Sequence, residues 1–389
     1  MFVCPRCGNK DERYIGHKNG APYCRKCIIF SGEEAKGIEH PPKKAPLSLA
    51  YKLSEEQSNL SRRIVENFVK GVDTLVYAVC GSGKTEISYG VLAYAISHGL
   101  RAGFALPRRD VVIELYWRMM KAFPNNKVVA VYGDHHRRLE GDIVILTTHQ
   151  LYRYPEYFDL LVMDEIDAFP FKGNDVLIAL YKKSLRGHCV LMSATPSEAI
   201  LKEFGRENHE ILELMTRFHK KPIPVPKVEL SIPIFQVLKI IKKLREYGKQ
   251  GKPCFVFAPT IDLCETLYSK VSIAVMGGDY VHSERQNKDQ IINAFKAGKL
   301  NYLLTTSVLE RGVTIKNLQV LVYQADKRSI YDSATLIQIS GRVGRKMDAP
   351  DGEVIFFAEK ETEEIADAVR KIEHYNTFLQ GLFQRCSSV

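Results

Sequence analysis

Five consecutive residues have the composition and spacing of a phosphate-binding loop: Gly81, Ser82, Gly83, Lys84 and Thr85. Glycines let the backbone wrap closely around a phosphate, and the amides at the start of the following helix point toward its negative charge. In this pattern Lys84 is expected to reach the β- and γ-phosphates of ATP, and the Thr85 hydroxyl is expected to bind Mg²⁺. An apolar run before the loop and a helical pattern after it favour this interpretation over a turn with an exposed lysine.

Two adjacent carboxylates, Asp164 and Glu165, follow a strongly apolar run at residues 160–163. Open α/β sheets bind their ligands at the carboxyl ends of the strands, which is where these side chains would lie. Asp164 is expected to hold the magnesium ion, and Glu165 to orient and deprotonate the water that attacks the γ-phosphate. The phosphate loop upstream favours this role over that of a solvated acidic turn.

Three polar residues late in the chain, Gln338, Arg342 and Arg345, are spaced so that a helix would place them on one face. The arginines are expected to act as arginine fingers on the γ-phosphate, a contribution of roughly 10³–10⁵ in rate. Gln338 is expected to join the ATP site. Such arginines would couple ATP chemistry to motion between two halves of the chain; the alternative is an exposed basic helix.

Gln57 stands upstream of the phosphate loop and is expected to contact adenine. It also lies three residues after Ser54, and this spacing is typical of a capping box at the start of a helix. The two roles are compatible, and the sequence leaves both open.

Hydroxyls, amides and arginines follow several predicted strands, and such groups suit contacts with the phosphates of a nucleic-acid strand. The residues expected to make these contacts are Pro107, Arg108, Thr147, Thr148, Thr305, Thr306 and Arg311. The residues expected to link them to the ATP site are Ser193, Ala194 and Thr195. The run of residues 135–138, His-His-Arg-Arg, is interpreted as a solvated loop in preference to a further contact.

Four cysteines in two C-x-x-C pairs have the spacing of a four-thiolate zinc ribbon: Cys4, Cys7, Cys24 and Cys27. A segment of about 45 residues can hardly fold without such a metal, and the presence of two pairs disfavours a redox-active motif. Zn²⁺ held by four thiolates has no open position, so the metal is expected to be structural. The sequence does not decide whether this module contacts nucleic acid or docks on a protein partner.

The remaining chain alternates β-rich runs with helical patterns, which predicts an α/β fold with parallel sheets and crossover helices. Strands are expected at residues 74–79, 102–106, 127–131, 143–147, 160–163 and 189–192, then at 254–258, 273–276, 302–306, 319–323 and 353–358. A closing helix is expected over residues 362–384. The predicted domains are a zinc ribbon (1–45), an ATP-binding lobe (46–215), a proline-punctuated hinge (216–235) and a second lobe (236–389).

The composition favours a basic cytoplasmic protein. The chain has 389 residues, a formal net charge of +10 and a pI near 9.0, which favour a polyanionic partner. No run approaches the length of a membrane span, and Cys4 and Cys7 stand where a signal peptide would have to lie. The sequence leaves open a peripheral location at the cytoplasmic face of a membrane complex.

Together these motifs resemble those of helicase superfamily 2, and the amino-acid sequence within and around them is similar to that of the ComFA family of late-competence ATPases. The similar segments are residues 147–151, 158–170, 309–314 and 338–345. The Asp-Glu-x-Asp-Ala-Phe-Pro motif is the most specific of them. The four-cysteine module also fits this family. The resemblance implies two RecA-like lobes and an ATPase that drives single-stranded DNA through the inner-membrane channel during natural transformation. It also implies competence proteins at that channel as partners.

Two other functions fit part of the pattern. A primosome-type replication-restart or repair helicase has similar lobes, but its cysteine cluster lies within the second lobe and a separate DNA-binding domain precedes the motor. A zinc-ribbon nucleic-acid-binding scaffold with an inactive ATPase is disfavoured by the intact lysine, glutamate and arginines described above. The direction of translocation, strand separation and the oligomeric state are left open by the sequence.

Overall fold

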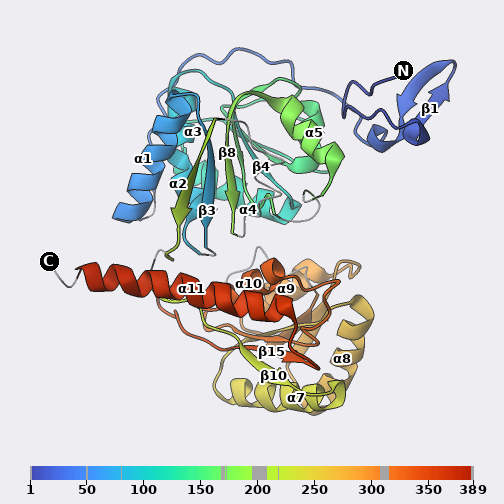
Figure 1. Cartoon of the computed structure of the whole chain (residues 1–389), viewed down its shortest axis with the longest axis vertical. Helices are drawn as coiled ribbons and strands as arrows, with labels where there is room; N and C mark the ends of the chain where they lie inside the picture. The colour runs from blue at the N-terminus through green and yellow to red at the C-terminus, as the bar shows by residue number, and fades with distance from the viewer. Residues whose placement is uncertain are drawn as a thin grey trace. The chain divides into compact units, whose positions relative to one another are not determined.

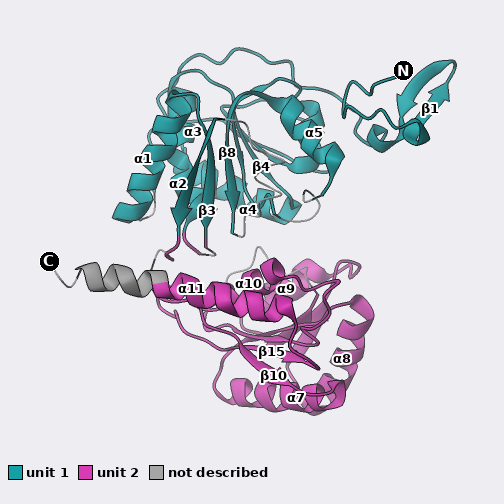
Figure 2. Ribbon diagram, in the orientation of Figure 1, with its two compact units in different colours: residues 1–78, 83–214 teal, residues 79–82, 215–389 magenta. Residues whose placement is uncertain are grey.

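The computed structural model describes residues 2–49, 51–79, 81–167, 171, 173–194, 208–217, 219–306 and 315–386, with side chains as far as residue 377. Two compact units divide the chain (Figure 2). The first contains residues 1–78 and 83–214, and the second contains residues 79–82 and 215–389. The N-terminal cysteine module therefore belongs to the first unit, and the start of the phosphate loop is grouped with the second.

The first unit is built on a seven-stranded, all-parallel sheet with the order β5-β6-β4-β7-β8-β3-β9. Its strands are β3 (Asp73–Ala78), β4 (Ala102–Leu106), β5 (Val128–Val131), β6 (Ile143–Thr147), β7 (Phe158–Met163), β8 (Leu185–Ser193) and β9 (His209–Leu214). Its helices are α1 (Glu55–Val69), α2 (Lys84–Ile87), α3 (Tyr89–Ser97), α4 (Arg109–Ala122), η3 (Thr148–Arg153) and α5 (Asp175–Ser184). Figure 1 shows helices on both sides of this sheet.

Alternate residues of β5, β6 and β7 belong to two separate apolar clusters, so the first sheet is buried on both faces. Because all its strands are parallel, the segments that follow β3, β4, β6, β7 and β8 lie along one edge. All six strands predicted for this lobe are present. The prediction missed β9, whose charged residues Glu210 and Glu213 interrupt a short apolar alternation at the end of the sheet.

The second unit is built on a six-stranded, all-parallel sheet with the order β10-β15-β14-β11-β13-β12. Its strands are β10 (Lys227–Leu230), β11 (Cys254–Phe257), β12 (Gly278–Val281), β13 (Tyr302–Thr305), β14 (Gln319–Val322) and β15 (Val354–Ala358). Its helices are α7 (Pro233–Lys249), α8 (Ile261–Ala274), α9 (Lys288–Lys296), α10 (Ser333–Ser340) and α11 (Glu363–Cys386). The closing helix predicted from the sequence corresponds to α11.

Two predictions for the second unit need correction. The strand predicted at residues 273–276 is wrong: α8 continues to Ala274, β12 follows, and Ile273 and Met276 are each 88% exposed. The apolar residues of this run belong to the last turn of α8 and the segment that follows it, so they do not form a strand. The segment predicted as a hinge also contributes β10 to the sheet, where it pairs with β15, and it contains the start of α7.

The cysteine module is a β-hairpin flanked by two short 3₁₀ helices, and an extended strap follows it. The elements are η1 (Glu12–Tyr14), β1 (Ile15–Lys18), β2 (Ala21–Cys24) and η2 (Arg25–Cys27). The two-residue turn of the hairpin has φ values of 53° at Asn19 and 79° at Gly20, as type I′ turns require. None of the helices formed by the described residues has both the length and the apolar composition of a membrane span.

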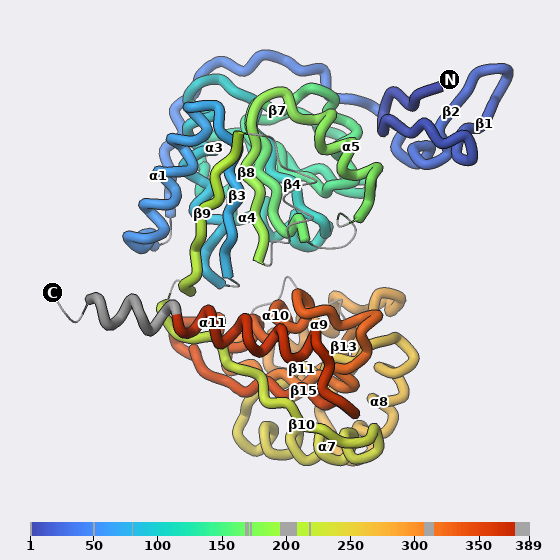
Figure 3. Tube along the Cα trace, viewed as in Figure 1, coloured from blue at the N-terminus to red at the C-terminus, as the bar shows by residue number. Residues whose placement is uncertain are grey.

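We call residues 28–45 the strap; it runs from the cysteine module along the first lobe to α1 (Figure 3). Some of its polar contacts are with α3 and with the segment that enters β6. Lys43 donates from Nζ to Oδ1 of Asp142 (2.7 Å) and from its backbone N–H to the carbonyl of Ile96 (3.2 Å). The N–H of Gly37 donates to Oε1 of Glu140 (3.0 Å). The strap is thus fixed to the lobe along its length.

Candidate ATP site, metal centre and nucleic-acid interface

Lys84 and Asp164 meet at the carboxyl edge of the first sheet. Lys84 begins α2, and its Nζ lies 3.4 Å from Oδ1 of Asp164, which follows β7. Asp164 is buried; burial raises the pKa of its carboxyl group, and the Lys84 ammonium opposes this shift. The structure therefore brings together the lysine expected to bind phosphate and the carboxylate expected to hold Mg²⁺.

Glu165 adopts a backbone conformation that side chains other than glycine rarely take. Its φ is 59°, and its N–H donates to Oδ1 of Asp164 (2.8 Å). Such a conformation costs about 1–3 kcal/mol and persists only where the surroundings impose it, most often at functional sites. The strain turns the chain sharply at the end of β7, directly after the residue that contacts Lys84.

Gln57 has the capping role and also contacts the phosphate loop. The Ser54 N–H donates to Oε1 of Gln57 (2.9 Å), and the Gln57 N–H donates to Oγ of Ser54 (3.1 Å), so the predicted capping box is confirmed. Gly83 has a φ of 77°, and a Cβ there would collide with Nε2 of Gln57. The adenine contact stays a prediction.

Three further residues of the phosphate loop occupy different surroundings. Gly81 has a φ of 82° and lies in the second unit, where a Cβ on it would be 3.8 Å from Nε of Arg217. Ser82 is fully buried and its N–H donates to the carbonyl of Val79 (3.2 Å). Thr85 lies in α2, half-buried.

The arginine motif is not one helix, contrary to the prediction. The helix α10 ends at Ser340, and a turn follows in which Gly344 has a φ of 66°. Glycines at both ends of this turn remove the helical preference, so Gln338 and the two arginines do not share a helical face. Gln338 and Arg342 are buried, and Nε of Arg345 donates to the carbonyl of Gly341 (2.9 Å).

Sequence reasoning missed Arg217, which holds this turn. Its side chain is 1% exposed, and its guanidinium donates to the carbonyls of Gly341 (3.2 Å), Val343 (2.9 Å) and Gly344 (3.1 Å). Nε2 of His219 donates to the same Gly344 carbonyl (2.8 Å). In the sequence Arg217 is one basic residue among several in a proline-rich stretch, which gives no indication that it is buried.

The residues expected to contact nucleic acid lie where parallel strands end, but their side chains are mostly enclosed. Thr147, Thr148, Thr305 and Thr306 are buried. Pro107 is buried after β4, and the half-buried Arg108 precedes α4. Ser193 and Ala194 are buried at the end of β8. Thr195 and Arg311 fall outside the described residues.

The four cysteine sulfurs are arranged as a tetrahedral metal requires. Sγ of Cys4 is 3.9 Å from that of Cys27, Sγ of Cys7 is 3.8 Å from that of Cys24, and all four lie within 4.8 Å of one another. Zn–S bonds of about 2.3 Å in a tetrahedron place sulfurs about 3.8 Å apart. The set therefore fits a structural Zn²⁺. Val176 of α5 packs against these cysteines.

Comparisons with known proteins agree with this geometry. Residues 58–204 match a family model described as DEAD/DEAH box helicase, and residues 236–347 match one described as helicase conserved C-terminal domain. The competence protein ComFA of Bacillus subtilis (strain 168) is 32% identical, covering 96% of this chain and 86% of the relative. ComFA of Streptococcus pneumoniae (strain R6) is 33% identical, covering 96% and 90%.

The fold matches that of solved helicases. The Saccharomyces cerevisiae protein Dbp5, in a structure bound to RNA and ADP BeF3, aligns with a TM-score of 0.62 at 18% identity, over 83% of this chain and 92% of that one. The predicted α/β architecture of two RecA-like lobes is therefore confirmed.

Proposed function

The chain belongs to the ComFA family of competence proteins, and from this premise we propose that it is a single-stranded-DNA-stimulated translocase that drives DNA uptake in natural transformation. It is an ATP-hydrolysing helicase or translocase of superfamily 2 associated with competence. The family relationship supports the choice of single-stranded DNA as the substrate. Competence proteins at the inner-membrane DNA channel are the proposed partners, and the cytoplasmic face of that membrane is the proposed place of action.

The observation that carries the proposal is the contact between Lys84 and Asp164 beside the strained Glu165. When ATP binds, Lys84 would turn to the β- and γ-phosphates, and the Asp164 carboxylate and the Thr85 hydroxyl would hold Mg²⁺, which supplies charge neutralisation. Glu165 would orient the attacking water and take its proton. Phosphoryl transfer depends mainly on such positioning and charge stabilisation.

The other site residues have proposed roles around this centre. Gly81, Ser82 and Gly83 would bind phosphate through their amides, and Gln57 would contact adenine. Arg342, Arg345 and Gln338 would act on the γ-phosphate. Ser193, Ala194 and Thr195 would connect hydrolysis to strand binding. The strand-binding residues would be Pro107, Arg108, Thr147, Thr148, Thr305, Thr306 and Arg311, which address the backbone without reading sequence.

The test is the rate of ATP turnover by the purified chain with single-stranded DNA, duplex DNA or RNA of equal length. We expect single-stranded DNA to give the largest stimulation. Equal stimulation by RNA, or none by any strand, would contradict the proposed substrate. In a transformable strain that lacks this chain, the wild type should restore uptake and Lys84→Ala should not.

We also propose that the four cysteines hold one structural Zn²⁺. Replacing Cys24 and Cys27 with serine should remove close to one equivalent of zinc and make the N-terminal module sensitive to protease, because such modules depend on their metal to fold. Unchanged zinc content in the double variant would refute the assignment. Replacing Cys254, buried in the second lobe, with serine is the control and should leave the zinc content unchanged.

A further inference from the structure

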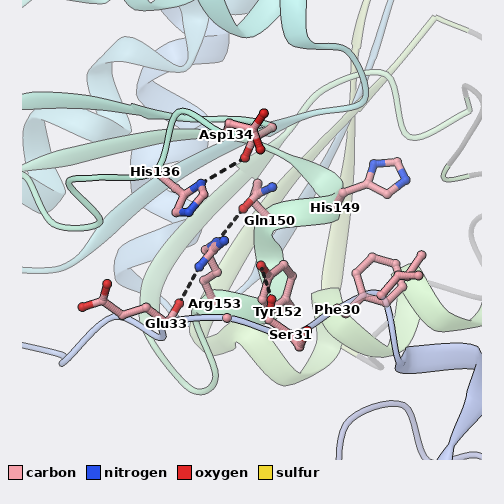
Figure 4. A pocket seen from close by; sticks show the side chains of 12 residues that line it. Phe30, Ser31, Glu33, Asp134, His136, His149, Gln150, Tyr152 and Arg153 are labelled. Carbon is pink, nitrogen blue, oxygen red and sulfur yellow. Dashed lines mark hydrogen bonds between the residues drawn. The ribbon is translucent and has the colours of Figure 1, made fainter.

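A pocket with a volume of about 460 Å³ lies between the strap and the first lobe (Figure 4). One wall is formed by residues 29–33 of the strap, a second by residues 133–136 of the loop after β5, and the third by residues 149–153 of η3. The volume is within the range of about 300–1,000 Å³ that is usual for small-ligand sites. The pocket lies entirely within the first unit.

The strap wall is held in place by η3 through three hydrogen bonds, and a fourth within η3 orients Arg153. Arg153, which is 4% exposed, donates from Nη1 to the carbonyl of Glu33 (2.8 Å) and from Nε to Oε1 of Gln150 (2.6 Å). The Tyr152 hydroxyl donates to the carbonyl of Ser31 (3.1 Å), and the Ala35 N–H donates to the carbonyl of Arg153 (2.8 Å). The pocket is therefore preformed.

Gly32 lets the strap lie directly on Arg153. Its φ is 150°, and a Cβ on it would lie 2.9 Å from Nη1 of Arg153 and 3.1 Å from the Tyr152 hydroxyl oxygen. A larger residue would have to push the strap away from η3. Gly32→Ala is thus a way to open this wall without touching the cysteines.

The pocket offers a flat aromatic surface and an apolar rim. The His149 ring is nearly parallel to that of Phe30, with centroids 6.2 Å apart and an interplanar angle of 24°. Burial lowers the pKa of His149, which favours the neutral ring. Ile29 is 76% exposed at the rim. A neutral ring and an aliphatic side chain suit a planar, uncharged group such as a nucleobase.

The surroundings of the pocket favour a nucleotide over a metal ion. Exposed Arg137 and Arg138 follow directly in the same loop and supply positive charge for phosphates beside the pocket, whose own lining includes the acidic residues Glu33 and Asp134. His149 is the neighbour of Thr148 in the chain. In the part of the chain that the structure describes, the four cysteines are the group arranged to hold a metal ion, and no residue of the pocket belongs to it.

We propose that this pocket binds one nucleobase of the strand whose phosphates meet Thr147 and Thr148. The strap that carries the zinc module would then take part directly in strand binding, and the loop of residues 135–138 would be a phosphate contact instead of a merely solvated loop. The inference rests on the proposed function, because it assumes a single strand on the first lobe.

The test compares the dissociation constants of an oligo(dT) strand and an abasic strand of the same length. The wild type should bind oligo(dT) about tenfold more tightly than the abasic strand, since stacking of one base contributes roughly 1–3 kcal/mol. His149→Ala should lose most of this preference while binding the abasic strand as before. Ile29→Ser, at an exposed position that does not support the core, should lose part of the preference for oligo(dT). Gly32→Ala should lose this preference while keeping its zinc.

His98→Ala is the matched control, because His98 is an exposed histidine that stacks on Tyr94 in the same lobe (centroids 3.9 Å apart). It should keep the full preference. An unchanged preference in both His149→Ala and Ile29→Ser would overturn the pocket assignment while leaving strand-stimulated ATP turnover, and so the proposed function, intact. If the wild type bound neither strand, the proposed function itself would fail.

Discussion

In the first lobe Lys84 and Asp164 of the proposed ATP site contact each other, whereas in the second lobe Arg345 contacts its own backbone. Lys84 pairs with Asp164 at 3.4 Å. Arg345 instead donates to the carbonyl of Gly341, and Arg342 is fully buried within the second unit. Ligand binding in the first lobe exchanges one ionic contact for others, but Arg345 must first leave its contact with the Gly341 carbonyl. Nucleotide binding would therefore require a rearrangement of side chains in the second lobe.

The largest expected effect comes from removing an arginine of the second lobe. Arg345→Ala should lower the strand-stimulated kcat by roughly 10³-fold, as loss of an arginine finger does elsewhere. Arg328→Ala is the control: Arg328 is exposed on the same lobe and pairs with Glu364 (3.1 Å). A kcat within threefold of the wild type for Arg345→Ala would show that its backbone contact is merely structural.

Loss of Arg217 should loosen the turn that carries the arginines. Arg217→Ala removes three hydrogen bonds from a charged donor to the carbonyls of the turn, of which those of Gly341 and Gly344 keep a bond from Arg345 and His219, and the loss costs about 3 kcal/mol. Hydrogen exchange of the amides at residues 341–345 should accelerate roughly 100-fold, a factor equivalent to that energy. Arg245→Ala is the matched control, because the exposed Arg245 also donates to a carbonyl, that of Ala274. Equal exchange rates in the two variants would argue against an anchoring role.

Acid should weaken the second lobe through Glu353. Partial burial raises the pKa of this carboxyl group, but hydrogen bonds from Lys227, Lys243 and Tyr247 outweigh burial and hold the pKa at about 2. A lowered pKa stabilises the fold above the unfolded value of about 4.3, and this stability is lost as the pH falls toward 2. Allowing for solvent screening, we expect a loss of about 2 kcal/mol.

Urea unfolding of the wild type and Glu353→Gln at pH 7, 4.5 and 3 measures this contribution. The stability difference between the two proteins should be largest at pH 7 and shrink at pH 3. A difference that stays constant with pH would contradict the assignment of the lowered pKa to Glu353.

The smallest expected effect tests how closely the first lobe is assembled around the phosphate loop. Gly83→Ala forces a Cβ against Nε2 of Gln57 and should weaken Mg·ATP binding about tenfold, or ~1.4 kcal/mol. Gly173→Ala is the control, since Gly173 has a similar φ of 71° but open space around its Cβ position. It should be strained to a similar extent without changing nucleotide affinity. Equal affinities in the two variants would mean that Gln57 simply moves aside.

The sequence was most informative where a parallel sheet determines position. The strands of the first lobe are continuous apolar runs, and the end of each such run predicts the edge where a ligand binds. Lys84 and Asp164 are far apart in the chain, yet their proximity follows from that rule and the structure shows it. The capping box of Ser54 and Gln57 could be predicted because it is local.

Long-range contacts were not predictable from local pattern. The helical spacing of Arg342 and Arg345 was misleading because α10 ends at Ser340, with Gly341 as its cap, before either arginine. Arg217 looks like a solvated charge until its three carbonyl partners, more than a hundred residues away, are known. Gly32 likewise gives no hint of its place on Arg153, because both belong to segments without regular hydrophobic periodicity.

The most direct test of the account is ATP turnover by the wild type and Glu165→Gln, each with and without single-stranded DNA. The substitution keeps the size of the side chain and removes the proposed base. We expect strong stimulation of the wild type, little turnover by Glu165→Gln under either condition, and similar ATP affinity for both proteins. Stimulated turnover by Glu165→Gln close to that of the wild type would contradict it.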